Sequence, residues 1–361
     1  MNPTLTYVEI CDLVRGIDPV AYGRTRNHLA GAVTKLSPYI TRGVISLPAV
    51  RDIVLERHST AEAEKFIQEL AWREYFQNVF TTKGDAIFSD LRFVREDWQH
   101  ENVVASVLQA QTGITVLDAS IQSLYETGYM HNHARMWVAM LSCNVAKAHW
   151  FNMSRYLYYH LIDGDLASNM LSWQWVAGTS AAKQYVAHQE LINACSGTTQ
   201  TGTYLDVPRE LVGASSVPVE LSAEAPFTYT TTYPTSDHLT AVAGTNVFLY
   251  HPWHIDPKWR QGETGEQIFV VDPAVFDKFP VSTVVMDHML TLVRTHLPKA
   301  KIFVGAPADI PGIGAATAVY TRAHPTLPAI FGIQDPVPKL FPEATGYYPS
   351  FFKFWQAAKY R

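Results

Sequence analysis

The stretch LIDGDLASNMLSWQW (161–175) places two carboxylates, an amide and two indoles in an otherwise apolar run. An unpaired carboxylate is costly to bury, so Asp163 or Asp165 needs a cation or a donor-rich ligand if this stretch lies inside the fold. Arg135 is an available cation. The aspartates could instead be a helix cap and a loop acid, and Trp173 and Trp175 could simply fill a core. The stretch therefore indicates either a buried polar site or ordinary packing.

Two further stretches combine charged, amide and large apolar side chains on one helix face, because residues i, i+3 and i+4 share a face. KFIQELAWREYF (65–76) and MHNHARMWVAM (130–140) group, respectively, Glu69, Trp72, Arg73 and Phe76, and Asn132, Arg135 and Met136. An amphipathic helix with an intrahelical Glu–Arg pair, worth roughly a few tenths of a kcal/mol, would explain one such face. Three such stretches together favour a site that several helices build.

The elements that carry these residues are predicted to be helical. Apolar residues recur at three- and four-residue spacing from about residue 20 to 195, with helices expected at 46–57, 61–80, 115–126, 131–148 and 152–162. Residues 196–244 are rich in Ser, Thr, Pro and Gly, which is typical of a linker. We expect a helical domain over 1–200, a linker over 201–244 and a second domain over 245–361.

The second domain is predicted to be α/β. Short β-branched runs at 246–251, 267–272, 300–305, 316–321 and 328–333 surround an amphipathic helix at 281–297. Unbroken apolar strands that alternate with helices indicate a Rossmann-like parallel sheet covered on both faces. No GxGxxG follows the first strand, so a dinucleotide fingerprint is absent.

Composition limits the class of protein. The 361 residues are 47% hydrophobic with a net charge of −5, which is typical of a globular chain and gives no overall basic field for nucleic acid. The three cysteines form neither a disulfide framework nor a CxxC site, and no apolar run is long enough for a membrane. We expect a cytoplasmic protein without a metal and with no membrane contact; the oligomeric state is unknown.

Four blocks in order, VTKLSPYITRG (33–43), ELAWREYF (69–76), TGYMHNHARM (127–136) and LIDGDLASNMLSWQW, resemble the flavin-binding helical domain of the DNA photolyase and cryptochrome family. The resemblance covers about residues 20–185 and implies FAD as the cofactor. It pairs Asp163 with Arg135 and places Asn169 at flavin N5, where its amide would favour the reduced cofactor. The cofactor contacts implied by the family are Tyr22, Thr34, Lys35, Leu36, Ser37, Arg73, Asn132, Arg135, Asp163, Asp165 and Asn169.

The resemblance also implies two further groups of residues. Trp173, Trp150 and Trp98 correspond to the indoles that carry an electron from the surface to the photoexcited flavin. Glu69, Trp72, Asn132, Met136 and Trp175 correspond to positions that hold a flipped pyrimidine dimer, where aromatic walls replace lost base stacking. Glu69 would also steady charge on the substrate, and we count it with Asn169 and the three indoles as catalytic.

These positions favour a light-dependent lyase that acts on UV-damaged DNA: light excites reduced FAD, one electron passes to the cyclobutane dimer, the ring opens and the electron returns. The alternative is a cryptochrome-like blue-light photoreceptor that keeps FAD and the tryptophans but repairs little. A light-independent FAD oxidoreductase is a third possibility. His133 stands where many dimer-repair members have an arginine, and this loss of a cation favours the photoreceptor.

Other departures concern the flanks of the resemblance. Residues 182–206 differ from the family's arginine-containing continuation, and Cys11, Cys143 and Cys195 are too few for an iron–sulfur cluster. The family places its α/β antenna domain before the helical one, whereas here an antenna-like segment follows it. This order indicates a circular permutation with a shortened antenna domain, and whether an antenna chromophore binds there is open.

Overall fold

The computed structural model describes residues 4–214, 216–327 and 331–359. The helical region contains α1 (Tyr7–Arg15), α2 (Pro19–Thr25), α3 (Ser37–Thr41), α4 (Leu47–Leu55), α5 (Thr60–Lys83), α6 (Ala105–Leu108), α7 (Thr115–Thr127), α8 (Asn132–Met140), α9 (Trp150–His160), α10 (Leu166–Ala177) and α11 (Gln189–Ser196). Helices therefore occur at each of the five expected ranges. The expected helix 131–148 is α8 followed by one π-helical turn, Leu141–Val145.

Local sequence explains where the central helices begin and end. Ser59 and Glu62 form a capping box at the start of α5, the longest helix of the described chain. Asp165 caps α10 by accepting a hydrogen bond from the amide of Ser168 (2.9 Å), and α10 ends at Gly178 in the left-handed conformation. The acid-rich stretch thus folds as a turn, an N-cap and a helix.

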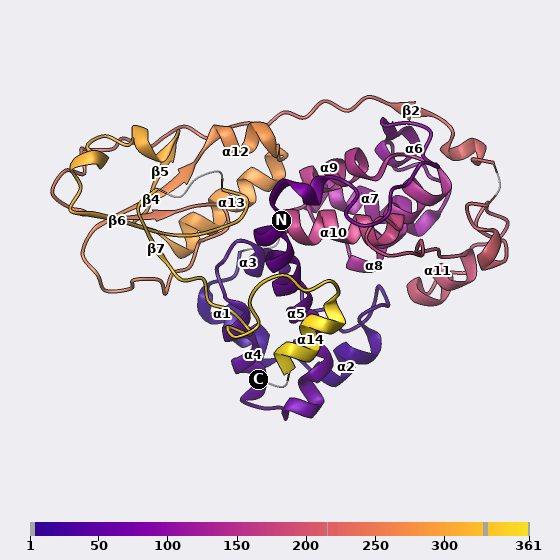
Figure 1. The fold of residues 1–361 in the computed structure, drawn as a ribbon, viewed down its shortest axis with the longest axis horizontal. Coiled ribbons are helices and arrows are strands. Elements are labelled where there is room, and N and C mark those ends of the chain that lie inside the picture. The colour runs from indigo at the N-terminus through magenta and orange to yellow at the C-terminus, as the bar shows by residue number, and fades with distance from the viewer. Residues whose placement is uncertain (1–3, 215, 328–330, 360–361) are drawn as a thin grey trace.

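Residues 201–244 run along the outside of the molecule from the helical region to the sheet (Figure 1). They contain the short strand β2 (Glu224–Ala225), which pairs antiparallel with β1 (Val103–Val104). Farther along, Phe227 packs edge-on against Tyr156 of α9, with ring centroids 4.9 Å apart. The domain boundaries expected at residues 200 and 244 stay predictions.

The second region is a five-stranded parallel sheet in the order β5-β4-β3-β6-β7. Its elements are β3 (Asn246–Tyr250), β4 (Glu266–Val271), α12 (Pro273–Lys278), α13 (Thr283–His296), β5 (Lys301–Val304), β6 (Ala318–Arg322) and β7 (Ile333–Asp335). The chain runs from the central strand β3 outward to β4 and β5, and then crosses to the other side of β3 to form β6 and β7. This strand order is Rossmann-like. The expected α/β fold is confirmed.

Two details differ from the sequence-based expectation. The fifth strand begins at Ile333, at the end of the expected 328–333, of which residues 328–330 lie outside the described part. Within the described part of this region, helices cover one face of the sheet, where α13 joins a core continuous with the helical region. The other face carries a separate small core of Val247, Leu249, Ile268, Val270, Val242, Ile310 and Ile313. Loops and short 3-10 turns complete this second layer, because the β5–β6 connection is too short and Gly/Pro-rich to form a long helix.

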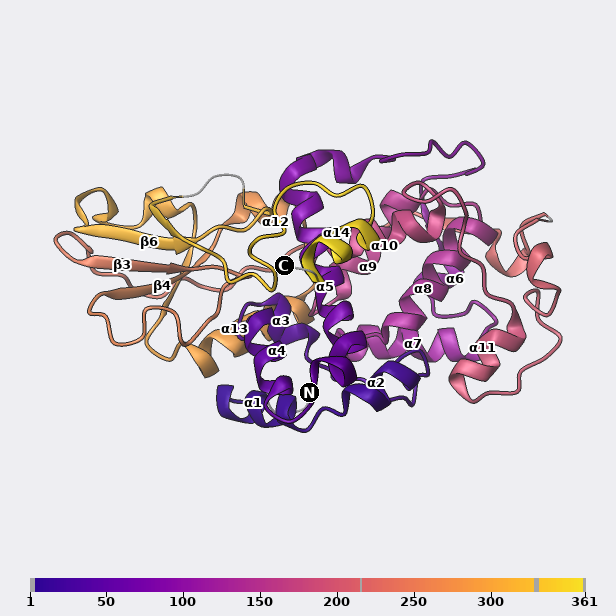
Figure 2. The same cartoon turned by 60° about the horizontal axis from the view of Figure 1, so that its bottom comes forward.

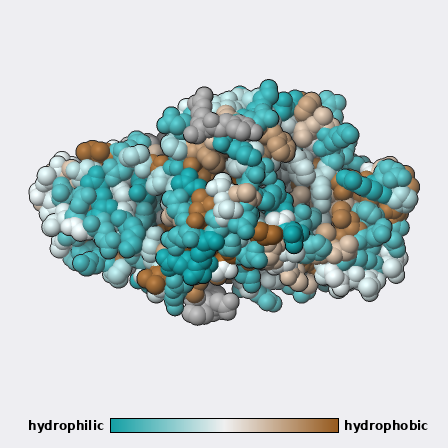
Figure 3. All heavy atoms as spheres, turned by 90° about the horizontal axis from the view of Figure 1, so that it is seen from below, coloured by the Kyte–Doolittle hydropathy of each residue, from teal (hydrophilic) through white to brown (hydrophobic). Residues whose placement is uncertain are grey.

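The last helix, α14 (Phe351–Lys359), follows the last strand of the sheet in the sequence. It packs against α5 of the helical region, as Figures 1 and 2 show from two sides. The surface seen from below is mainly hydrophilic, with apolar residues in small separate groups (Figure 3). Within the described residues, no helix has the length and apolar character needed to cross a membrane.

Candidate flavin site

A cavity of about 210 Å³ opens among α3, α5, α8, α9 and α10. Its wall combines polar and apolar side chains. The lining residues are Ser37, Arg73, Tyr129, Asn132, Arg135, Met136, Ala139, Leu157, Leu161, Asp163, Asp165, Ser168, Asn169, Ser172, Trp173 and Val176. The cavity is thus surrounded by three stretches that lie far apart in the sequence, namely 69–76, 129–139 and 161–176.

An ion pair lies at the centre of this cavity. One guanidinium nitrogen of Arg135 donates to both oxygens of Asp163, at 3.0 and 2.8 Å, and its Nε donates to the carbonyl of Met130 at 2.8 Å. Asp163 is 5% exposed. Burial raises the pKa of this carboxyl, but the charge and hydrogen bonds of Arg135 outweigh burial and hold the pKa below its usual value. Asp163 is therefore ionised and paired with Arg135.

Asp165 combines structural and site roles. Besides capping α10, it accepts a short hydrogen bond from the side-chain amide of Gln77 in α5, and it lines the cavity. The two readings offered by the sequence, helix cap and buried site acid, therefore both describe this residue. Gln77 was not among the expected site residues.

Arg73 brings a second cation to the wall. Its guanidinium donates to Oγ1 of Thr41 at 2.6 Å, and the Thr41 hydroxyl donates in turn to the backbone carbonyl of Asp163 at 3.1 Å. Thr41 thus ties α3 to the turn before α10. No sequence spacing indicated this role, because its partners lie 32 and 122 positions away.

The loop before α3 and the first residue of α3 carry four of the expected cofactor contacts. Ser37 lines the cavity and bonds to Asp163, whereas Thr34, Lys35 and Leu36 lie outside the lining. Lys35 adopts φ +53°, a left-handed conformation that is uncommon for a non-glycine residue and frequent at ligand sites. Tyr22 in α2 also lies outside the lining; its ring packs edge-on against Phe66 at 5.2 Å.

Asn169 has one end of its amide committed. Its Nδ2 donates to the backbone carbonyl of Ser154 in α9 at 2.9 Å. The side-chain oxygen has no comparable partner in the described structure, and the residue lines the cavity. Asn169 therefore offers an acceptor to a ligand N–H group.

Two of the three predicted electron-transfer indoles are buried and the third is exposed. Trp173 is 2% exposed and lines the cavity, Trp150 is also 2% exposed, and Trp98 is 39% exposed. The His149 ring lies between the outer two, 6.0 Å from Trp150 and 5.1 Å from Trp98 between centroids. Asp90 accepts a 2.7 Å hydrogen bond from the Trp150 indole.

The five residues expected to hold a substrate are not all in one place. Asn132 and Met136 line the cavity. Glu69 is paired with Arg26 (3.2 Å) and Lys65 (2.8 Å). The other two are aromatic: Phe351 stacks on Trp72, and Trp175, which is 42% exposed, packs beside the ring of Tyr185 at 5.5 Å.

His133 has a structural role in this arrangement. Its Nδ1 lies 2.7 Å from the carbonyl of Asn27, so Nδ1 carries the proton, and Nε2 lies 3.3 Å from the Tyr185 hydroxyl. Burial lowers the pKa of His133, which is therefore neutral near pH 7. The position where many dimer-repair relatives have a cation carries no charge here.

Tyr129 is the cavity residue that sequence reasoning missed most clearly. It directly precedes the MHN block, and the Arg135 guanidinium lies 5.8 Å from the centroid of its ring. Ser168 and Ser172 also line the cavity, four residues apart on α10.

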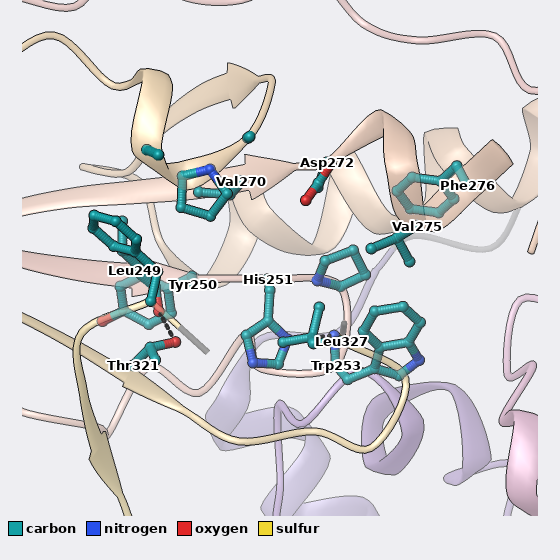
Figure 4. A pocket seen from close by; sticks show the side chains of 15 residues that line it. Leu249, Tyr250, His251, Trp253, Val270, Asp272, Val275, Phe276, Thr321 and Leu327 are labelled. Atoms are coloured by element: carbon teal, nitrogen blue, oxygen red, sulfur yellow. Dashed lines mark hydrogen bonds between the residues drawn. The ribbon is translucent and has the colours of Figure 1, made fainter. Parts of the chain in front are cut away.

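A second cavity, of about 260 Å³, lies at the carboxyl ends of β3, β4 and β6 (Figure 4). Ligands of open parallel sheets bind at such switch points. Its wall is largely apolar, with Trp253, Val275, Phe276 and Leu327 among its lining residues. His251 is neutral there, because burial lowers its pKa to about 4, and its Nε2 donates to the Arg322 carbonyl at 3.0 Å.

Residues 66–207 match the family model described as the FAD binding domain of DNA photolyase. The deoxyribodipyrimidine photo-lyase of Streptomyces griseus is 33% identical over 160 residues, which is 44% of this chain and 35% of that protein. The cryptochrome DASH of Natronomonas pharaonis is 32% identical over 166 residues, 44% of this chain and 35% of that protein. A Synechocystis cryptochrome structure aligns over 53% of this chain and 42% of its own, at 25% identity and a TM-score of 0.47.

The helical region is thus a flavin-binding domain of the photolyase type. Over residues 66–207 the chain is similar to the FAD binding domain of DNA photolyase, and FAD is its cofactor. The chain spans about a third of the length of the relatives that it matches. The cavity suits FAD, since apolar walls fit a flat ring system whose polar edge would meet the Asn169 oxygen and the Arg135–Asp163 pair. Among the described residues no cluster of His, Cys, Asp or Glu could hold a metal ion.

Proposed function

We propose that this protein is a deoxyribodipyrimidine photolyase: a light-dependent lyase that splits cyclobutane pyrimidine dimers in UV-damaged DNA. The proposal rests on one observation above all, that Asn132 and Met136 share a wall of the flavin cavity with Arg135. Residues expected to touch a lesion and residues expected to hold the cofactor therefore alternate along a single helix, α8. A base brought to this wall would lie next to the cofactor.

Bound FAD supplies light absorption and the transferable electron. The chain's own residues bind the cofactor, orient it and shield it from water. Arg135 and Asp163 form a neutral pair that brings hydrogen-bonding edges to the ring without adding net charge. Leu157, Leu161 and Val176 keep water from the opposite wall. Asn169 accepts a hydrogen bond from a protonated ring nitrogen and so favours the reduced cofactor.

The substrate residues have complementary tasks in this proposal. Trp175, which is exposed, and the free face of Trp72 offer stacking surfaces that replace the stacking lost when a dimer leaves the duplex. Asn132 reads a pyrimidine edge through its amide. Glu69 steadies the charge that develops on the lesion, while Arg26 and Lys65 keep its carboxylate in place. UV-damaged DNA is the proposed partner, and the cytoplasm remains the expected location.

A cryptochrome-like photoreceptor is the second candidate. Neutral His133 favours it, because a cation at this position would add affinity for the phosphates of DNA. In this case the flavin and the tryptophans would respond to blue light, with little repair.

One experiment separates the two candidates. Purified, FAD-loaded protein is illuminated with an oligonucleotide that holds a single thymine dimer, and recovery of thymine absorbance is followed. Repair predicts full recovery, whereas unchanged lesions together with normal photoreduction of FAD would leave the photoreceptor. The double variant Trp72→Ala/Trp175→Ala should lose lesion binding and retain FAD. Loss of FAD instead would mean that these indoles belong to the cofactor site.

A further inference from the structure

The C-terminal helix supplies an aromatic ring to the candidate substrate site. Phe351, the first residue of α14, stacks face to face on Trp72 of α5, with centroids 3.7 Å apart and ring planes 9° apart. Phe351 is 2% exposed, whereas its neighbour Phe352 is 66% exposed. Only one of the two adjacent rings is therefore used in this contact.

The segment before α14 is fastened to the same helix that carries Trp72. The buried carboxylate of Glu74, two residues after Trp72, accepts hydrogen bonds from the amides of Leu340 and Phe341, the latter at 2.9 Å. Arg51 of α4 donates to the Leu340 carbonyl at 2.9 Å. A carboxylate that receives two backbone N–H groups is a strong and specific anchor. The segment that leads into α14 is thus held against α4 and α5.

The stack leaves part of Trp72 available. Phe76 lies 5.3 Å away at a tilt and Tyr75 lies 5.9 Å away edge-on, so of these three rings only Phe351 is stacked parallel on the indole. Trp72 is only half-buried. With Phe351 on one face, the accessible remainder of the ring is the part that a flipped base could meet.

We propose that Phe351 is a positioning residue of the lesion site: it holds the Trp72 indole from behind in one orientation, ready to stack on a pyrimidine dimer. This inference rests on the proposed function. The physical gain is preorganisation, because an indole already held flat loses less freedom when the base arrives. The end of the chain beyond the sheet thus completes a site whose other residues come from the helical region.

The test compares Phe351→Ala with Phe352→Ala, an exposed neighbour on the same helix. Binding is measured in the dark by fluorescence anisotropy, with a single-stranded oligonucleotide that holds one thymine dimer and with the same strand undamaged. We expect Phe351→Ala to weaken lesion binding by about 3- to 10-fold, the range of one aromatic stack. Binding of the undamaged strand, FAD content and photoreduction should not change. Phe352→Ala should match the wild type.

Two more variants guard against a general loss of folding. Phe351→Tyr keeps the stacking ring and should restore lesion binding, whereas Phe351→Leu keeps apolar volume without a ring and should not. Equal lesion preference in the wild type and Phe351→Ala would overturn the inference. Tighter lesion binding by Phe351→Ala would overturn it as well, since Phe351 would then be blocking the site. A wild type without any lesion preference would instead remove the proposed function, and this inference with it.

Discussion

The indole N–H of Trp150 donates to Oδ1 of Asp90 over 2.7 Å, in a part of the helical region where Trp150 is 2% exposed. The other oxygen of Asp90 accepts from the backbone N–H of Arg95 at 3.0 Å, which fixes the carboxylate. A carboxylate at this distance stabilises positive charge on the indole and is placed to take its proton. Trp150 is therefore the one predicted electron-transfer indole with a built-in anionic partner among the described residues.

This contact predicts the behaviour of Asp90→Asn. When an electron leaves Trp150 to refill Trp173, the Nε1 proton can pass to Asp90, leaving a neutral indole radical and a neutral carboxylic acid. Asparagine accepts a hydrogen bond but not this proton, so the radical should stay protonated. The electron should then return to Trp150 faster. We expect photoreduction to fall several-fold. Time-resolved absorption in H₂O and D₂O distinguishes the protonated radical from the neutral one. Asp85→Asn, at an exposed pair with Lys278, is the matched control.

The Arg135–Asp163 pair predicts a strong asymmetry between its two partners. Arg135→Gln leaves a buried carboxylate unpaired and should lower the stability by about 3 kcal/mol or more. It should also impair FAD binding. Asp163→Asn leaves only the partly exposed Arg135 without its partner and should cost less. Chemical unfolding and flavin absorbance measure both. Equal losses in the two variants would mean that the pair is not buried in solution as it is here.

Much of this site could be predicted from sequence because its residues lie at helical spacing. Asn132, Arg135 and Met136 share one face of α8, and the acids Asp163 and Asp165 directly precede α10. The strands were predictable for a similar reason, since β-branched runs mark them. Contacts between distant segments gave no such signal. Three such contacts join residues that are distant in the sequence and meet only in the fold: the Thr41 bridge, the Asp90–Trp150 hydrogen bond and the Phe351–Trp72 stack.

The loop-covered face of the sheet was missed for a related reason. Apolar strands such as β3 and β4 report that both faces are buried, but not which elements bury them. Here residues around Val242 and Ile310 do so without forming a long helix. Similarly, the sequence indicated the loss of a cation at position 133. It could not indicate the hydrogen bond of His133 to Asn27, because that bond depends on how α2 and α8 meet.

Asn169 predicts a shift in the redox potential of the bound cofactor. Because Nδ2 is held by the Ser154 carbonyl, the side-chain oxygen is the group left for a protonated flavin nitrogen. Asn169→Ala removes this acceptor, which is worth about 1 kcal/mol, and should lower the two-electron midpoint potential by about 20 mV. Spectroelectrochemistry measures it directly. Ser172→Ala, another cavity residue on α10, provides the control and should leave the potential within a few mV, about the precision of the method.

Buried neutral histidines predict acid sensitivity at a pH where carboxylates are still charged. Burial lowers the pKa of His131, His160, His251, His288 and His296 to about 4. The unfolded chain takes up these protons below about pH 6.5, whereas the folded chain does not until about pH 4. Stability is therefore retained above pH 6.5 and lost as the pH falls from there to 4. Unfolding at pH 5 should take up several protons per molecule.

A pair of histidine variants tests this mechanism. His296 is 7% exposed and its Nε2 has no hydrogen-bond partner in the described structure. His296→Gln should reduce the proton uptake on unfolding at pH 5 by about one, which flattens the dependence of the unfolding free energy on pH by about 1.4 kcal/mol per pH unit. His238, which is exposed, provides the control variant His238→Gln. Calorimetry at several pH values measures both. Equal slopes in the two variants would show that His296 is already protonated in the fold, contrary to its burial.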